Sequence, residues 1–203
     1  MCEVLFVFLL FFPACFYLSL QKSLFVSLRT ITDVIAVVRP VNELNLIDLM
    51  DEAKEEILRA NSSAARFKES QRARSRLLFE YLRRMAFNSL VIVLWARAEK
   101  QKLEGPGMPE DVATAKTIGD VIESGTVFRI YAALALAKLS WWILLDGFRL
   151  WQARSLATLL YVASIDGLGE YRRLLNAVSV LAAGQGSEAQ ERLLALLRGG
   201  VVS

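Results

Sequence analysis

Hydrophobic and polar positions change their pattern several times along this chain, and the first pattern is apolar on every side. Residues 4–20, VLFVFLLFFPACFYLSL, contain no charged side chain. A run of this length is near the lower limit for a transmembrane helix, and Lys22 can extend toward the headgroups so that residues 23–28 lengthen the run. We therefore predict a hydrophobic, transmembrane N-terminal helix.

Three other interpretations of residues 4–20 stay open. A cleaved signal peptide has a basic region before its apolar run, whereas only Glu3 precedes this one. Lipidation at Cys15 would follow cleavage after a small residue, but the Phe and Pro that stand further upstream fit such a site badly. The third interpretation is a helix buried against protein. If the run spans a bilayer, the bulk of the chain faces the cytosol, matrix or stroma, because bases follow the run at Lys22, Arg29 and Arg39.

The next pattern mixes β-branched residues with an acidic amphipathic stretch. Residues 30–41, TITDVIAVVRPV, end at a proline that keeps its predecessor extended, so they fit either a continued helix or a short strand. Asn42 is a good N-cap for a helix over residues 42–60, with apolar side chains at helical spacing and acids on the other face. Asn61-Ser62-Ser63 marks a break and a new cap.

The longest uninterrupted pattern runs from Ala64 to Leu103, where neither Gly nor Pro occurs. It predicts a strut helix of about forty residues and about 60 Å. Its first half is amphipathic. Residues 86–96, AFNSLVIVLWA, are apolar all round and must therefore be buried.

The C-terminal pattern predicts several helices after a linker, GPGMP, at residues 105–109. Pro109 can open a helix that ends at Ser124-Gly125, and a hydrophobic helix follows over residues 127–151. The tail predicts three shorter helices, separated by Asp166-Gly-Leu-Gly and Gly184-Gln-Gly. These lie at residues 155–164, 170–183 and 187–200, the last with a capping box at Ser187 and Gln190 and a C-cap at Gly199.

The helix at residues 127–151 contains a lysine that decides how it can be interpreted. Lys138 is the only charge between Ile130 and Leu145. A lysine at mid-bilayer costs about 2.5–3.5 kcal/mol, and the Leu and Ile residues of this segment recover roughly 2–3.6 kcal/mol. The two terms nearly cancel, so residues 127–148 fit either an assisted membrane span or a core helix of a soluble protein.

These patterns predict an all-α fold, in which the hydrophobic N-terminal helix precedes a multi-helix bundle with one long strut helix. Residues 1–41 form the membrane anchor and connector, and residues 42–104 the charged amphipathic helix plus the long helix. Residues 105–203 form a C-terminal helical bundle that includes the candidate second membrane-embedded helix at 127–148.

Composition strengthens the membrane interpretation and removes most catalytic chemistry. With glycine counted in place of tyrosine (11 against 5), about 58% of the chain is hydrophobic, against roughly 45–50% of a soluble domain. The chain has no histidine and two cysteines without a CxxC spacing, so His-dependent triads and common zinc or haem sites are excluded. Nucleotide-binding glycine motifs are absent from the sequence as well. We expect no enzyme, no cofactor and no metal.

Charge is balanced overall but locally separated. The net charge is +3, from 24 Lys and Arg against 21 Asp and Glu, with an acidic segment at residues 43–56 and a basic one at 66–84. The basic face can pair with the acidic helix, contact lipid headgroups or a protein partner, or bind nucleic acid, which its few aromatic residues make the least favoured. Its candidate contact residues are Arg66, Lys68, Arg72, Arg76, Arg83 and Arg84.

Lys138 is the candidate intramembrane polar residue. As a proton-relay or coupling group it would need an acidic partner, for which Asp146 and Asp120 are available. The simpler alternative is a lysine that points into a polar crevice of the bundle.

The sequence names no family, because no motif in it is specific enough. Missing catalytic groups and excess apolar surface favour a non-catalytic accessory or scaffold subunit of a larger, energy-transducing membrane complex. Its partners would be other subunits and membrane lipid, in a mitochondrial or other organellar inner membrane or a bacterial inner membrane. One alternative is a peripheral membrane-binding or remodelling protein that uses the basic amphipathic helix. Another is a transporter or channel component.

Overall fold

A computed structural model of the protein describes residues 28, 30–104, 112–147 and 156–199. All regular elements of the described residues are α-helices, so the all-α prediction is confirmed for this part of the chain. The predicted N-terminal helix and the GPGMP linker lie outside the described residues. The helices are α2 (Ile31–Val37), α3 (Glu43–Met50), α4 (Glu52–Ala60), α5 (Ala64–Leu103), α6 (Val112–Gly147), α7 (Leu156–Ala183) and α8 (Ser187–Arg198).

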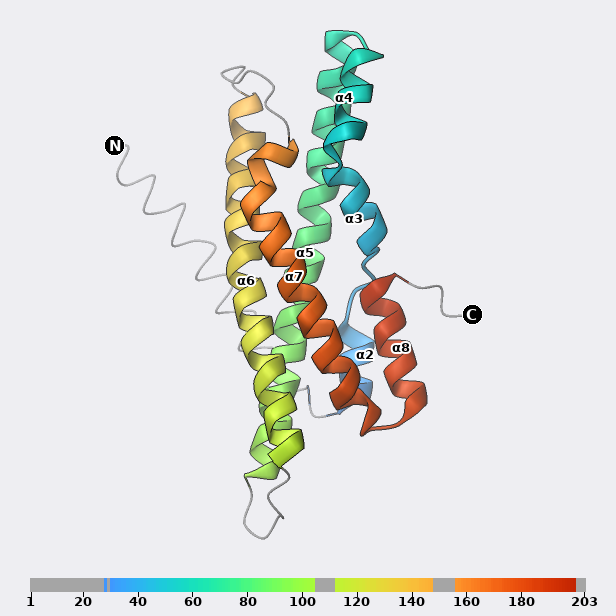
Figure 1. Ribbon diagram of the computed structural model, residues 1–203, viewed down its shortest axis with the longest axis vertical. Helices are drawn as coiled ribbons and strands as arrows, with labels where there is room; N and C mark the ends of the chain where they lie inside the picture. The colour runs from blue at the N-terminus through green and yellow to red at the C-terminus, as the bar shows by residue number, and fades with distance from the viewer. Residues whose placement is uncertain (1–27, 29, 105–111, 148–155, 200–203) are drawn as a thin grey trace, which may run out of the picture.

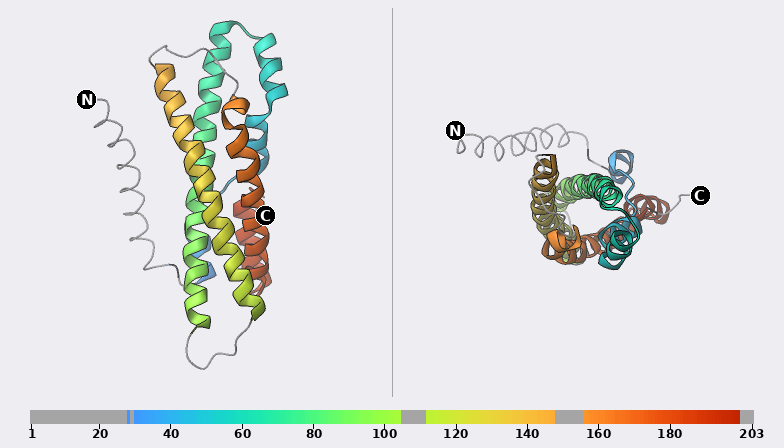
Figure 2. Two further views of the ribbon diagram at one scale, coloured as in Figure 1. Left: turned by 60° about the vertical axis from the view of Figure 1, so that its left-hand side comes forward. Right: turned by 90° about the horizontal axis from the view of Figure 1, so that it is seen from above.

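Three long helices, α5, α6 and α7, form the body of the bundle, and α6 runs antiparallel to both α5 and α7 (Figure 1). The short helices do not surround this body evenly. In the end-on view of Figure 2, α6 lies on one side, whereas α3, α4 and α8 lie on the opposite side. The outer face of α6 is therefore left without a described neighbour, and this asymmetry positions the candidate site.

The predicted strut is confirmed as α5, a single helix of 40 residues. Ser63 caps it, because its hydroxyl accepts a hydrogen bond from the Arg66 N–H at 3.4 Å. Burial of the stretch 86–96 is confirmed for Leu90–Ala96, which are each at most 4% exposed, whereas Ala86 and Phe87 are partly buried. In the amphipathic first half of α5, Leu77 is an apolar residue that remains 53% exposed.

The connector before α3 is neither a continued long helix nor a strand. Thr30 and Asp33 form a capping box that starts α2, and the backbone becomes extended at Val38. Buried Asn88 of α5 then holds the extended segment. Its side-chain amide donates to the Arg39 carbonyl at 2.7 Å and accepts from the Arg39 N–H at 2.9 Å.

The helix predicted for residues 42–60 is wrong as one element, because the chain breaks at Asp51 into α3 and α4. Asn42 caps α3 as predicted. The Asp51 carboxylate accepts hydrogen bonds from the backbone N–H groups of Ala53 and Lys54, which makes it the N-cap of a new helix. A local side-chain bond of this kind competes with helix continuation.

The predicted helix end at Ser124-Gly125 is wrong, since α6 runs through it without interruption. Gly125 is needed there for close packing and not for a turn. A Cβ atom at this position would lie 2.4 Å from Cγ2 of Val93, and the Ser89 hydroxyl donates to the Gly125 carbonyl at 2.9 Å. Packing of α6 against α5 therefore overrides the weak helix propensity of glycine.

The predicted break at Asp166-Gly-Leu-Gly is also wrong, because α7 is one helix. Gly167 is buried, and a Cβ atom there would lie 3.3 Å from Cβ of Tyr131 on α6. Both misread glycines thus lie where α6 meets a neighbouring helix. A small residue at a crossing lets two helix backbones approach closely.

The end of the chain is fixed by α8 and its caps. The predicted capping box is wrong, since Gly186 is the N-cap and makes no side-chain bond, while the Gln190 amide donates to the carbonyl and hydroxyl of Ser179, each at 3.0 Å. Gly199 is a C-cap as predicted, with φ of 74°. A side chain there would also collide with the Val41 carbonyl, which lies 2.6 Å from the Cβ position.

Tyr171 joins three helices at this end of the bundle and gives a testable pH dependence. Its ring packs against Phe128 with centroids 5.0 Å apart, and its hydroxyl donates to the Leu197 carbonyl at 3.3 Å. Burial raises the pKa of the Tyr171 phenol well above its ordinary value. The folded state therefore keeps this proton at a pH where the unfolded chain releases it.

We expect Tyr171→Phe to lower the free energy of unfolding by about 1 kcal/mol at neutral pH, because one buried hydrogen bond is lost. The contribution of Tyr171 to the free energy of unfolding is complete below a pH of about 10, the pKa of tyrosine in the unfolded chain, and declines at higher pH. The difference between wild type and variant should then shrink or reverse. Urea unfolding between pH 7 and 11 measures this, and a difference that stays constant would contradict it.

Candidate functional site

The basic residues predicted on α5 lie on two different flanks of the helix. Each residue turns an α-helix by about 100°, so the direction of every side chain around the α5 axis can be measured from Ser89, which points toward α6. The side chains to either side of this direction form two flanks. One flank contacts the connector and α3 through Arg74, Tyr81 and Asn88. Lys68, Arg72, Arg76 and Arg83 fall on the other flank, which we call the basic flank, whereas Arg66 and Arg84 fall on the α3 side.

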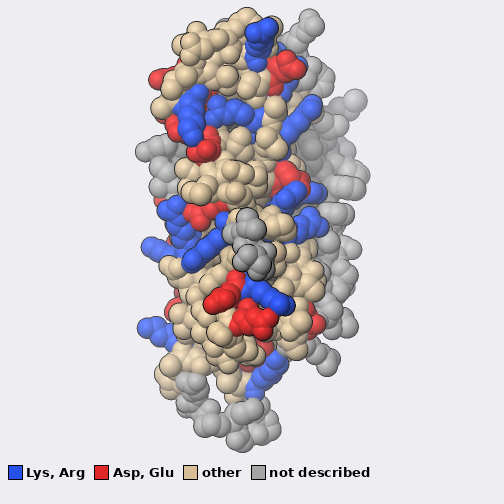
Figure 3. Space-filling view, turned by 90° about the vertical axis from the view of Figure 1, so that its right-hand side faces the viewer, with Lys and Arg blue, Asp and Glu red and all other residues tan. Residues whose placement is uncertain are grey.

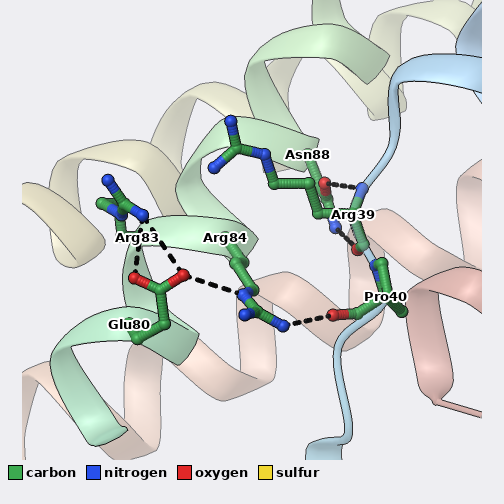
Figure 4. A network of polar contacts seen from close by, with 6 residues as sticks. All are labelled: Arg39, Pro40, Glu80, Arg83, Arg84 and Asn88. Atoms are coloured by element: carbon green, nitrogen blue, oxygen red, sulfur yellow. Dashed lines mark hydrogen bonds and ion pairs between the residues drawn. The ribbon is translucent and has the colours of Figure 1, made fainter. Parts of the chain in front are cut away.

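Arg84 of the α3 side and Arg83 of the basic flank share the Glu80 carboxylate (Figure 4). Glu80 accepts from Arg84 Nε at 3.0 Å and lies 2.9 Å from Arg83 Nη2. Arg84 also donates to the Pro40 carbonyl at 3.5 Å, so it ties the connector to α5. Hydrogen bonds from Arg83 and Arg84 lower the pKa of the Glu80 carboxyl.

Two acids of α3 pair with bases outside the predicted set. Asp48 pairs with Lys54 at 2.7 Å, and Glu43 pairs with Arg172 of α7 at 2.6 Å. Where α3 approaches α5, the contact is made by the Arg74 guanidinium, which donates to the Leu49 carbonyl at 2.8 Å. These two ion pairs join α3 to α4 and to α7.

The outer face of α6 carries a row of exposed, large apolar side chains. Their exposed fractions are 58% for Ile130, 54% for Leu134, 53% for Trp141 and 46% for Leu144. Spacings of four, seven and three residues place them on one side of the helix. This row, which we call the α6 stripe, is about 21 Å long at 1.5 Å per residue.

Lys138 lies at the edge of the α6 stripe and is exposed. Its proposed partner Asp120 is on the same continuous helix, 18 residues away, which is about 27 Å. The two side chains cannot meet at that distance, so this pairing is wrong. The side chain of Asp146 lies outside the described part of the chain. Of the adjacent tryptophans, Trp142 is packed at 5% exposure and Trp141 belongs to the stripe.

The basic flank and the α6 stripe lie at the same level of the bundle. The position of each row along its helix can be measured from the contact between Ser89 of α5 and Gly125 of α6. Along α6, the stripe covers about 8 to 28 Å from that point; along antiparallel α5, Arg83 to Arg72 cover about 9 to 26 Å in the same direction. The contacts with α3 and the connector occupy the other flank of α5, so the basic flank borders the outer face of α6.

The opposite side of the molecule has a different surface. Figure 3 views this side and shows both signs of charge interspersed over it. The large apolar side chains exposed on α3 and α4 are Leu44 at 74%, Ile57 at 61% and Ile47 at 37%. The α6 side thus carries a row of four exposed apolar side chains with bases along one border, whereas the α3 and α4 side carries charges of both signs and separate exposed apolar side chains.

One described helix, α6, is long and apolar enough to cross a membrane, over the 33 residues Val112–Leu144. Only 28% of its most apolar stretch is buried inside the bundle. Core helices of soluble proteins also satisfy these criteria of length and composition. Burial and charge around α6 must therefore decide whether it is a membrane span or a core helix of a soluble protein.

No group of three or more metal-ligating side chains comes together among the described residues. Comparisons of the chain with family models, with curated proteins and with solved structures give no match. The candidate site is the exposed surface formed by the α6 stripe and the basic flank. The stripe was not predicted from the sequence as a separate feature, although the helical spacing of its four residues is visible there.

Proposed function

We propose that this protein is a non-catalytic accessory or scaffold subunit of a larger membrane complex, in an organellar or bacterial inner membrane. The observation that carries the proposal is the lateral asymmetry of the bundle. Its α6 side presents a continuous apolar stripe, whereas its α3 and α4 side presents mixed charge. A surface of this kind suits a protein held between a membrane or membrane-bound partner and a water-facing partner.

An uncovered stripe is unfavourable in water, which is why we infer that something covers it. Large apolar side chains that are exposed singly are common, but contiguous apolar patches mark interaction or membrane sites. Ile130, Leu134 and Trp141 follow one another on a single helix face and are each more than half exposed. Covering them stabilises the assembled state over the free chain.

A perpendicular crossing by α6 is disfavoured by its neighbour. Arg72, Arg76 and Arg83 are exposed on α5 at the same level as the stripe. If α6 spanned the bilayer within this bundle, the three arginines would enter hydrocarbon at a cost of about 2.5–3.5 kcal/mol each, roughly 9 kcal/mol together. The apolar residues of α6 recover roughly 2–3.6 kcal/mol. We therefore assign membrane insertion to the segment at residues 4–20.

The water-facing side offers a surface for protein partners. Leu44 and Ile57 are the most exposed large apolar side chains on α3 and α4, and charges of both signs are interspersed over this side of the molecule (Figure 3). An apolar centre with a polar rim is the usual arrangement of a protein interface. Such anchors supply binding energy, and the surrounding charges supply orientation.

A second candidate function is peripheral membrane binding or remodelling, and the basic flank favours it. Four bases, Lys68, Arg72, Arg76 and Arg83, share one side of α5 next to an apolar face. Polybasic helices of this kind attract anionic lipid, at about 1 kcal/mol per base near the surface. This function needs no partner subunit, so it differs from the first proposal in its behaviour after gentle solubilisation.

Native electrophoresis of the tagged full chain, after mild detergent extraction of membranes, tests the proposal. We expect migration with an assembly much larger than the chain, and retention in the membrane after alkaline carbonate washing. Leu44→Lys with Ile57→Lys should release the chain from the assembly, because charge replaces the apolar anchors.

The matched control is Val180→Lys, which replaces an apolar side chain that is 64% exposed on α7. This variant should stay in the assembly. A wild-type chain that migrates as a lone monomer, or a carbonate wash that removes it, would contradict the scaffold proposal. A chain that stays on vesicles without any assembly would favour the second candidate.

A further inference from the structure

We propose that the α6 stripe lies flat on an anionic phospholipid bilayer, with the α6 axis parallel to the membrane plane and the basic flank of α5 on the headgroups. This inference rests on the proposed function and names the partner of the apolar side. It assigns that side to lipid and leaves the α3 and α4 side to protein.

The first argument is the shape of the surface. The stripe is confined to one side of α6, because the positions that face inward, such as Phe128, Ala132 and Leu139, are at most 3% exposed. A helix with one apolar face lies in the interface plane with that face about 5–10 Å into the headgroup and acyl boundary. A spanning helix, in contrast, is apolar on all sides that lipid touches.

The second argument is charge complementarity. Packed helices lie about 8–10 Å apart, so the basic flank borders the stripe at about the spacing between acyl chains and phosphates. Arg72 and Arg76 are exposed at the level of the stripe, and Lys138 is exposed along its edge. Arginine and lysine can keep their stems on apolar surface while their charges reach the phosphates. The two rows together match a bilayer surface that is apolar inside and anionic outside.

The third argument concerns acids on the same face. Glu123 and Asp120 are the exposed acids on the outer side of α6, and both precede the stripe by at least seven residues along the helix. No acidic side chain lies between Ile130 and Leu144. Anionic headgroups would therefore meet no like charge on α6 along the whole stripe.

Depth measurements on the full chain test the proposal. Cys2 and Cys15 are replaced by Ser, and a nitroxide is attached to a single Cys at position 130, 134 or 141, in separate variants. Each variant is reconstituted into vesicles that contain phosphatidylglycerol. Collision rates with oxygen and with a water-soluble nickel complex then give the depth of each label, and a label at position 44 serves as the water-facing control.

For a helix that lies flat, we expect the three stripe labels to report lipid exposure at nearly equal depth, and the label at position 44 to report water. A perpendicular helix would separate the depths of positions 130 and 141 by about 16 Å, because position 141 lies eleven steps of 1.5 Å further along the helix. That result would overturn the proposal. Low collision rates with both reagents would also overturn it, since they mean that residues 4–20 or another protein cover the stripe.

Vesicle composition and charge reversal test the contribution of the basic flank. We expect at least a fivefold drop in the lipid-exposed fraction at position 134 in pure phosphatidylcholine vesicles, and in the variant Arg72→Glu, Arg76→Glu, Arg83→Glu. The control Lys54→Glu, Arg192→Glu, Arg198→Glu makes the same change in net charge on α4 and α8. It should leave position 134 unaffected.

An equal response of both charge variants, or indifference to anionic lipid, would overturn the proposal. The composition arm needs no substitution, so it holds even if a charge variant folds poorly. The native gel reports separately on the scaffold function. If the chain comigrates with an assembly but the depth labels show that protein covers the stripe, only this inference is contradicted. If the stripe lies flat and exposed to lipid but the chain joins no assembly, only the scaffold proposal is contradicted.

Discussion

Gly125→Val is expected to lower the free energy of unfolding by about 3 kcal/mol, at the upper end of overpacking costs. The reason is the crossing of α5 and α6, where even a Cβ atom at position 125 would lie 2.4 Å from Cγ2 of Val93 and 3.4 Å from the Ser89 hydroxyl. Val93 is fully buried and β-branched, so its methyl groups cannot rotate away inside the helix. The two helices must therefore separate. Urea unfolding in mild detergent measures the loss.

Gly119→Val is the matched control, because it makes the same substitution in the same helix with no atom within 4 Å of the new Cβ. It should change stability by less than about 0.5 kcal/mol. In the double variant Val93→Ala, Gly125→Val, the smaller side chain on α5 makes room for the larger one on α6. This variant should recover at least half of the stability that Gly125→Val loses. Equal losses at positions 119 and 125 would show that helix propensity, and not the crossing, explains the effect.

This crossing also matters for the proposed membrane face. It sets the level of α5 against α6, and that level places Arg72, Arg76 and Arg83 beside the stripe. A helix pair that separates or slides here would move the basic flank relative to the apolar row. Gly125→Val should therefore weaken anionic lipid contact at position 134, while Gly119→Val should not.

Asn88→Leu is expected to lower the free energy of unfolding by roughly 2–4 kcal/mol. The Asn88 side chain satisfies both the N–H and the carbonyl of Arg39, at 2.9 and 2.7 Å, and is itself fully buried. Leucine has a similar size but leaves these two backbone groups without that partner, at about 1–3 kcal/mol for each group that water cannot reach. The connector that carries α2 into the bundle should then loosen.

Hydrogen exchange at Val38 and Arg39 separates this cause from a general loss of stability. Both amides should exchange faster in Asn88→Leu than global unfolding explains. The control is Asn176→Leu, which makes the same change at an exposed position on α7 and should be close to neutral. If exchange at Arg39 followed global unfolding alone, the assigned role of Asn88 would be wrong.

Predictions from short sequence patterns were correct where the structure depends on residues that are close together in the chain. Asn42, Ser63 and Gly199 act as caps as predicted, because capping depends on side chains within a few residues. The 40-residue α5 follows from the absence of Gly and Pro, and the burial of its second half from the apolar pattern. The all-α class follows from the same short-range periodicity.

Local signals failed where a distant helix changed the meaning of a residue. Gly125 and Gly167 look like breaks in the sequence, yet each lies at a helix crossing with Val93 or Tyr131. Gln190 looks like a capping residue but bonds to Ser179 across the turn. Propensity is worth at most about 1 kcal/mol at such positions, and packing of a neighbouring helix outweighs it.

The sequence by itself therefore determined the helical class, the long strut, the buried apolar half of that strut and the set of basic residues. Only the tertiary structure divided those bases between two flanks and left one row of α6 uncovered beside four of them. The physical reason is the separation along the chain over which each effect acts. Periodicity and capping act within a few residues, whereas exposure depends on which helices pack together, and contacts such as Ser89 with Gly125 join residues far apart in the chain.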